Sequence, residues 1–181
     1  KRIAGKGAFR FASAWLNAQI DRDSEVELRW QDALRAGSLG LGWQALSSAH
    51  DGQAGAWLAQ AVCHGELLPR WVTPDPDLAL QADLAMLEAL AAEVEVGKAP
   101  EPARLILAPA RSSLCDPRFV SSCRGVHARI HERGASLVLE LPVFAMVPEP
   151  LRELLNRGIE IALRLSRPEQ LALACLAEPG L

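Results

Sequence analysis

The chain has 181 residues, a formal net charge of −3 and a 50% share of hydrophobic residues. This composition excludes an intrinsically disordered chain, because enough apolar side chains are present to form a core. The absence of a basic cluster argues against a nucleic-acid-binding surface. No uncharged apolar run reaches the roughly 18 residues of a membrane span, so we expect no transmembrane helix.

Residues 1–22 begin with basic residues and contain glycines. We predict a tail or linker from a preceding domain here, and a disordered N-terminus is the alternative. A single α/β domain is predicted over residues 23–181. Asp23 or Ser24 is expected to cap its first helix, which Gly37 ends.

Two apolar stretches, 39–46 and 54–62, follow and predict a β-hairpin. A loop with three prolines is predicted over 64–76. Asp77 is expected to cap a long helix that runs to about Val96.

The second half of the chain alternates between strand and helix signals. Residues 104–108 predict a short strand, and Asp116-Pro117 predicts the start of a helix that ends near Gly134. A last helix is expected from about Arg167. Alternation of strands and helices indicates an α/β fold with a parallel sheet.

Residues 136–165 give the clearest signal, a βαβ unit. An apolar run at 137–141 predicts a buried strand, a helix opens around Pro148 and Pro150, and a second buried strand follows Gly158. Glu140 is a carboxylate inside the first of these strands. Its position suggests either a functional group near the carboxyl end of a strand or an ion pair with Arg164.

The histidines and cysteines are also considered as possible metal or disulfide sites. His127 and His131 are spaced i, i+4 on a predicted helix but lack the glutamate of a His-Glu-x-x-His motif, so two solvated surface histidines are expected. The cysteines at 63, 115, 123 and 175 form no C-x-x-C pair and are expected to be free thiols in a reducing compartment.

Several stretches occur in the order and near the spacing of conserved motifs in one known family. They are LRWQDALRAGSLGLGWQAL (28–46), HDGQAGAWLAQA (50–61), GELLP (65–69), LILAPARSSLCDPRFV (105–120), LVLELPV (137–143) and LNRGIEIALRL (155–165). Together, over roughly residues 25–167, they resemble the EAL domain family. The front piece KRIAGKGAFRF is similar to the end of a GGDEF domain, which often precedes EAL domains.

The resemblance implies a fold and an activity. EAL domains are (β/α)8 barrels that, when active, hydrolyse the bacterial second messenger cyclic di-GMP with two divalent metal ions. It therefore implies an α/β, TIM-barrel-like EAL fold, incomplete or truncated after about five or six strands. An incomplete barrel leaves open sheet edges, so we expect a protein partner or a homo-oligomer.

The departures from the family pattern concern its metal ligands. The signature glutamate falls on Trp57, the asparagine on Ala108 and the adjacent aspartate pair on Arg164 and Leu165, so that Glu140 alone matches a ligand position. Gln44 matches the nucleotide-contacting glutamine. One carboxylate beside an arginine does not hold two cations, so we expect no metal, no cofactor and no hydrolysis.

EAL domains also have an arginine that contacts a phosphate of the ligand. In the resemblance this position falls on Ala61, so the arginine is missing from this chain. Gln44, Trp57, Glu140 and Arg164 are then the remnant ligand-binding positions, and Trp57 either stacks on a guanine or fills the emptied metal site. The favoured function is a catalytically inactive regulatory or protein-interaction module in bacterial cyclic di-GMP signalling, located in the cytoplasm. A non-hydrolysing cyclic di-GMP receptor is the alternative, and an active phosphodiesterase is the least favoured.

Overall fold

The computed structural model describes residues 4–47, 52, 54–69, 75–101, 103–142 and 149–165. The helices are α1 (Ala4–Ala36), α2 (Pro76–Glu95), α3 (Pro117–His131) and α4 (Glu149–Leu155), with a 3-10 turn at Ser113–Cys115. The strands are β1 (Leu39–Ser47), β2 (Ala54–Cys63), β3 (Glu66–Leu67), β4 (Arg104–Leu107), β5 (Ser136–Pro142) and β6 (Glu160–Arg164). No helix among these described residues is both long and apolar enough for a membrane span.

The six described strands form one mixed sheet in the order β1-β2-β4-β5-β6, with the short β3 paired to β2. β1 and β2 form the predicted antiparallel hairpin, and β2, β4, β5 and β6 run parallel. Parallel neighbours need a crossover, and α2, α3 and α4 supply the crossovers in turn. The expected α/β class is confirmed, with the strand–helix order of an incomplete (β/α)8 barrel.

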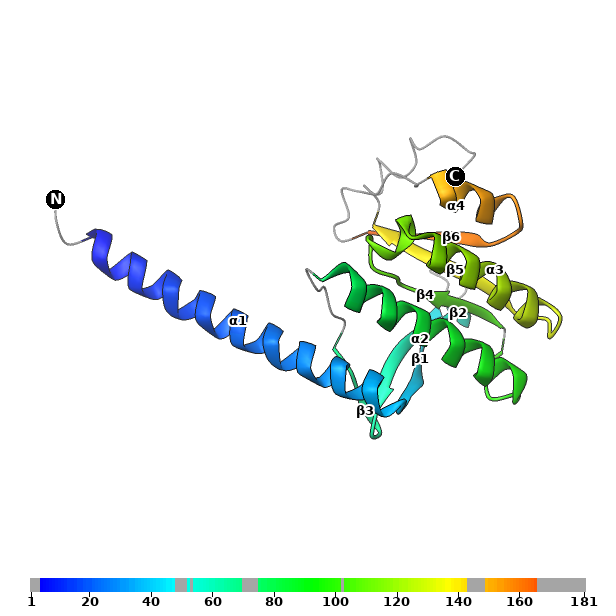
Figure 1. Ribbon diagram of the computed structural model, residues 1–181, viewed down its shortest axis with the longest axis horizontal. Coiled ribbons are helices and arrows are strands. Elements are labelled where there is room, and N and C mark those ends of the chain that lie inside the picture. The colour runs from blue at the N-terminus through cyan, green and yellow to red at the C-terminus, as the bar shows by residue number, and fades with distance from the viewer. Residues whose placement is uncertain are drawn as a thin grey trace.

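The core lies between the sheet and one layer of helices. α2, α3 and α4 all lie on the same side of the sheet (Figure 1). Leu105, Leu137 and Leu139 of the central strands are completely buried, and they pack with Leu87 of α2 and Phe119 of α3. This burial explains why the apolar runs at 104–108 and 137–141 predict strands.

The first helix differs from the prediction. α1 is continuous from Ala4 to Ala36, so the expected start at Asp23 or Ser24 is wrong. The mostly alanine and long-chain residues of this stretch favour helix on both sides of that point, and an N-cap residue inside a helix does not stop it. Gly37 does end the helix, with a positive φ of 58°.

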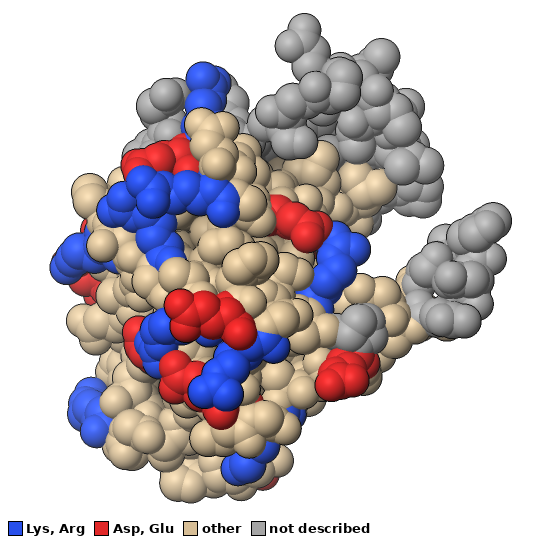
Figure 2. All heavy atoms as spheres, turned by 90° about the vertical axis from the view of Figure 1, so that its right-hand side faces the viewer, with Lys and Arg blue, Asp and Glu red and all other residues tan. Residues whose placement is uncertain are grey.

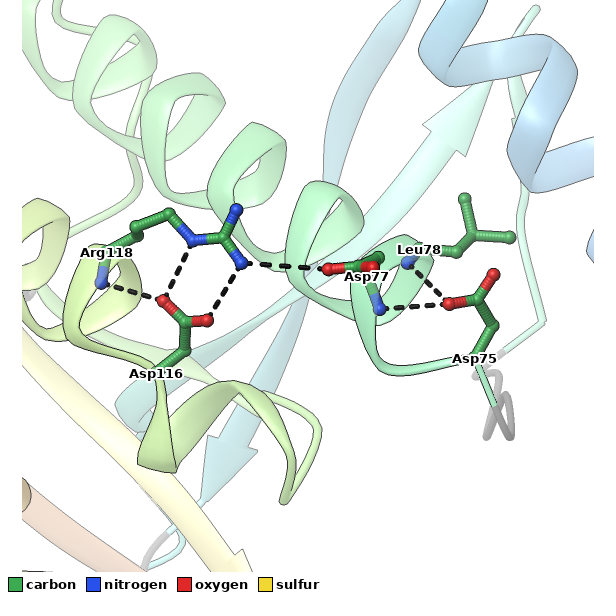
Figure 3. A network of polar contacts seen from close by, with 5 residues as sticks. All are labelled: Asp75, Asp77, Leu78, Asp116 and Arg118. Atoms are coloured by element: carbon green, nitrogen blue, oxygen red, sulfur yellow. Dashed lines mark hydrogen bonds and ion pairs between the residues drawn. The ribbon is translucent and has the colours of Figure 1, made fainter.

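The start of α2 also differs from the prediction. Asp75, not Asp77, is the N-cap, and its carboxylate accepts hydrogen bonds from the backbone N–H groups of Asp77 and Leu78 (Figure 3). Pro76 then occupies the first helical turn, where its missing N–H is tolerated.

The start of α3 agrees with the prediction, because Asp116 caps it and accepts from Arg118 N–H. The Arg118 side chain also lies 2.9 Å from Asp116 Oδ2 and 3.7 Å from Asp77 Oδ1, which connects the starts of α2 and α3 (Figure 3). The same guanidinium lowers the pKa of Asp116 through its hydrogen bonds.

Three further expectations concern the loop at 64–76, the βαβ unit and the last helix. The predicted loop at 64–76 contains the two-residue strand β3, which pairs with the end of β2. The predicted βαβ unit is confirmed as β5, α4 and β6, with Gly158 at a φ of 89° before β6. The helix expected from about Arg167 lies outside the described residues.

Candidate functional site

The sheet has two faces, and alternation along the strands assigns each residue to one of them. Residues 105, 107, 137, 139 and 141 belong to the helix-covered face, because their side chains are part of the core. Their neighbours along the strands therefore belong to the second face. Strand register places Gln44 beside Leu58, Leu58 beside Ile106, and Ile106 beside Val138. Gln44 and Glu140 are thus on the same, second face.

Glu140 and Arg164 form an ion pair on this second face. Arg164 is the last residue of β6, and its Nη1 lies 3.4 Å from Oε1 of Glu140 on β5. The glutamate side chain is only 11% exposed, whereas the arginine side chain is 39% exposed. The ion pair considered from the sequence is confirmed, and the guanidinium satisfies a poorly hydrated carboxylate.

A second ion pair joins β4 and β6 and lies nearer the amino ends of the strands. Arg104, the first residue of β4, contacts Glu160, the first residue of β6. Between the two ion pairs lie Ile106 and Val138, which are 5% and 2% exposed. Arg104 and Arg164 each neutralise a carboxylate of another strand, and sequence reasoning missed the Arg104–Glu160 pair because it needs the strand order.

A glutamine pair adds further polar groups to the second face. Gln60 on β2 donates from Nε2 to Oε1 of Gln44 on β1, at 3.2 Å. Gln60 was not singled out from the sequence, although it is the one strongly polar residue in the apolar strand Ala54–Cys63. That isolation is the signal that could have identified it.

Trp57 lies on the other side of the sheet. It is paired with Leu105, packs against the core and donates from its indole N–H to the carbonyl oxygen of Glu101. The structure therefore brings Glu140 and Arg164 into contact and places Gln44 on their face, but it separates Trp57 from all three. Neither of the two expected roles of Trp57 fits this arrangement, because Trp57 cannot stack on a ligand held by Glu140 or fill an emptied metal site beside it.

The donor set does not fit a pair of divalent metal ions. Such ions need several oxygen ligands that are free of other cations. The carboxylates of Glu140 and Glu160 on the second face are each paired with an arginine, which would repel a divalent cation. In the part of the chain that the structure describes, no three His, Cys, Asp or Glu side chains are close enough to hold a metal together.

The two histidines of α3 are not both solvated, contrary to the expectation. His131 is exposed, but His127 is half-buried, and the two rings stack with centroids 5.6 Å apart. Burial lowers the pKa of His127, and the neighbouring His131 lowers it further. Both effects favour the neutral imidazole.

The charges on the face that Figure 2 shows are mixed in sign. Figure 2 shows Lys and Arg side chains interleaved with Asp and Glu in small clusters. One cluster joins α2 and α3, where Arg129 lies 3.0 Å from Glu88 and 2.8 Å from Glu95. The expected absence of a nucleic-acid partner stays a prediction.

Comparison with known proteins gives matches among solved structures. No protein-family model matches the chain, and no curated protein matches it. The crystal structure of the FimX EAL domain matches with a TM-score of 0.49 and 16% identity, over 83% of this chain and 67% of that one. The chain is similar to EAL domains.

Two further solved structures are similar to this chain to a comparable degree. The LapD S helix–GGDEF–EAL structure from Vibrio cholerae, in the apo state, matches with a TM-score of 0.48 and 12% identity, over 85% of this chain and 54% of that one. The cAMP-bound EAL enzyme Bd1971 matches with a TM-score of 0.45 and 13% identity, over 95% and 54%. The chain spans about half to two thirds of the length of these structures.

Proposed function

We propose that the chain is a catalytically inactive EAL-like domain that works as a regulatory or protein-interaction module in cytoplasmic, bacterial cyclic di-GMP signalling. The observation that carries this proposal is the ion pair of Arg164 with Glu140. In the motif resemblance Glu140 is the one remaining metal-ligand position, and Arg164 stands where the family has an aspartate. A fixed guanidinium there occupies the carboxylate and opposes a divalent cation.

The chemistry of two-metal hydrolysis explains why this single exchange matters. The two cations generate the attacking hydroxide and stabilise the charge that develops on the phosphate. An arginine stabilises phosphate charge but does not bind and acidify a water molecule as a metal does. In the part of the chain that the structure describes, the second face therefore offers a guanidinium for an anion but no metal-binding group that would generate the nucleophile.

A specific observation favours a non-hydrolysing cyclic di-GMP receptor as the second candidate. Gln44 and Gln60 present amide groups on the same face as Arg164, whose side chain is partly exposed. Amide groups can hydrogen-bond a base edge, and a guanidinium can bind a phosphate, although Arg164 would then have to share its charge with Glu140. The loss of the family's phosphate-contacting arginine at Ala61 weakens this candidate.

Calorimetric titration with cyclic di-GMP separates the two candidates. The interaction module predicts no binding in the micromolar range, and micromolar or tighter binding would establish the receptor. Arg164→Ala should abolish any such binding, whereas Trp57→Phe, on the other face, should leave it unchanged. Product formed from cyclic di-GMP in the presence of Mg²⁺ or Mn²⁺ would contradict both candidates.

A further inference from the structure

His127 lies at the contact between α3 and the turn that joins α4 to β6. Its Nδ1 is shielded from solvent and has no hydrogen-bond partner among the described residues. Its Nε2 faces the turn, where a Cβ added to Gly158 would lie 3.9 Å away. Gly158 has a φ of 89° and is followed by Ile159, which is only 2% exposed. The imidazole is therefore part of the packing that holds this turn against α3.

The short helix α4 has two further points of attachment. Leu154 is fully buried in the core. Glu153 accepts a hydrogen bond from Nη1 of Arg124 on α3 at 3.0 Å, and Nη2 of Arg157 lies 3.2 Å from the same oxygen. A charged His127 would thus meet a carboxylate that already pairs with two guanidinium groups.

The neighbours of His127 along α3 offer no negative charge. One turn later lies His131, and the two rings stack with centroids 5.6 Å apart and an angle of 25° between their planes. One turn earlier lies Cys123, a buried thiol whose pKa is raised to about 12, so it stays neutral at ordinary pH. Arg124, three residues earlier, is a cation. A proton added to His127 would therefore lie beside a second imidazole and near an arginine.

Protonation would make the packed ring a poor fit to its surroundings. In imidazolium both nitrogens are donors, and a donor at Nδ1 would be buried without an acceptor. Burial is the largest cause that lowers the pKa of His127, and His131 is the next. The backbone of Arg157 acts in the opposite direction and has the smallest effect. The charged ring is therefore disfavoured while the turn is docked, and it is favoured once water reaches it.

We propose that His127 is a pH-sensitive switch, which holds the turn between α4 and β6 against α3 when its imidazole is neutral and releases the turn when its imidazole is protonated. The turn leads into β6, which carries Glu160 and Arg164, so its release would loosen the strand that contributes to both ion pairs of the second face. The proposal does not depend on the proposed function, because it requires no ligand at that face.

The direction of the pH dependence follows from the lowered pKa. Once the turn is released, the imidazole has its ordinary pKa of about 6.5 and binds a proton more readily than in the docked state. The docked turn therefore keeps its full stability above this pH and loses stability as the pH falls below it. The loss is complete below the pKa of the docked ring.

Hydrogen exchange of the full chain, followed by mass spectrometry, tests the switch. The protection of the backbone amides of residues 154–160, corrected for the pH dependence of intrinsic exchange, should fall severalfold between pH 7.5 and pH 5.5. Protection of the central strands β4 and β5 should change little, which distinguishes release of the turn from unfolding of the whole domain.

Two substitutions separate titration from packing. His127→Gln keeps a neutral amide donor at every pH, so the protection of residues 154–160 should no longer depend on pH over this range. His131→Gln is the matched control on the same helix. It removes the imidazole that helps to lower the pKa of His127, so the fall in protection should remain and its midpoint should move to higher pH. A purely structural role of His127 would not move that midpoint.

Nuclear magnetic resonance of the imidazole nitrogens gives the pKa of His127 directly, and it should agree with the midpoint of the exchange data. Circular dichroism verifies that both variants keep their helices. Unchanged protection of residues 154–160 in the unsubstituted chain, an equal fall in β4 and β5, or an equal fall in His127→Gln would each overturn the proposal. A midpoint that His131→Gln does not raise would also overturn it.

Discussion

Nη1 of Arg164 lies 3.4 Å from Oε1 of Glu140, across the neighbouring parallel strands β6 and β5. Because the glutamate side chain is only 11% exposed, the carboxylate depends on protein groups more than on water for its stabilisation. Arginine suits this role, since it stays protonated and presents a fork of N–H donors. The pair therefore contributes to the stability of the sheet, and it places a cation beside the carboxylate of Glu140.

Removal of the guanidinium should destabilise the protein. For Arg164→Ala we expect a loss of about 1–2 kcal/mol in the free energy of unfolding, between the values for exposed and for fully buried ion pairs. Urea denaturation measures it. The double variant Glu140→Gln/Arg164→Ala should be more stable than Arg164→Ala, because no charge then remains on the glutamate position. Equal stability of the two variants would show that the unpaired Glu140 carboxylate carries no burial cost.

The N-cap of α2 makes a matched pair of substitutions possible. Asp75→Ala should cost about 1 kcal/mol of stability, because it removes the acceptor for the N–H groups of Asp77 and Leu78. Asp77→Ala should cost less, since Asp77 contributes mainly an exposed 3.7 Å contact with Arg118. The midpoints of denaturant unfolding compare them, and the opposite order would restore Asp77 as the cap.

The strands could be predicted from the sequence because buried strands require runs of apolar residues. The stretches 39–46, 54–62 and 104–108 all became strands within one or two residues, and Asp116-Pro117 became the start of α3. These strands are apolar runs that end near glycine or proline. Such runs can be recognised from the local sequence alone, without knowledge of which strands lie side by side.

The candidate site could be predicted only in part. Glu140 was recognised because a carboxylate inside an apolar strand is unusual, and Arg164 because the motif resemblance aligns it with an aspartate position. The face that Trp57 occupies could not be found, because it depends on strand register, and a shift of one residue exchanges the two faces. The Arg104–Glu160 pair joins strands that are not adjacent in sequence or in the sheet, so no local pattern contains it.

The ion pairs between α2 and α3 should give the stability a defined pH dependence. The Arg129 hydrogen bond lowers the pKa of Glu95 below its usual value. A depressed carboxyl pKa contributes stability above the unfolded-state value of about 4.3 and loses it as the pH falls through the folded-state value.

Arg129→Ala should therefore destabilise the protein at pH 6, and the difference from the unsubstituted chain should shrink toward pH 3. Unfolding measured across this range provides the test. Arg133→Ala is the control with a smaller expected effect, because Arg133 makes the smallest contribution to the pKa of Glu95. A difference between Arg129→Ala and the unsubstituted chain that does not change with pH would contradict this explanation.

The thiols should differ sharply in reactivity. Burial, with a smaller contribution from Asp83, raises the pKa of Cys123 to about 12, whereas Cys115 is exposed. Only the thiolate reacts, so at pH 8 Cys115 should be alkylated rapidly in the folded protein and Cys123 only after unfolding in urea. Peptide mapping by mass spectrometry separates the two sites. Equal rates in the folded state would contradict the burial of Cys123.

A turnover assay tests the central claim most directly. The full chain would be incubated with cyclic di-GMP and saturating Mg²⁺ or Mn²⁺, and the linear dinucleotide would be quantified. We expect no product above the rate without protein, because Arg164 occupies the carboxylate that would bind a cation. Metal-dependent product that disappears with Glu140→Gln would show that the site is an active phosphodiesterase.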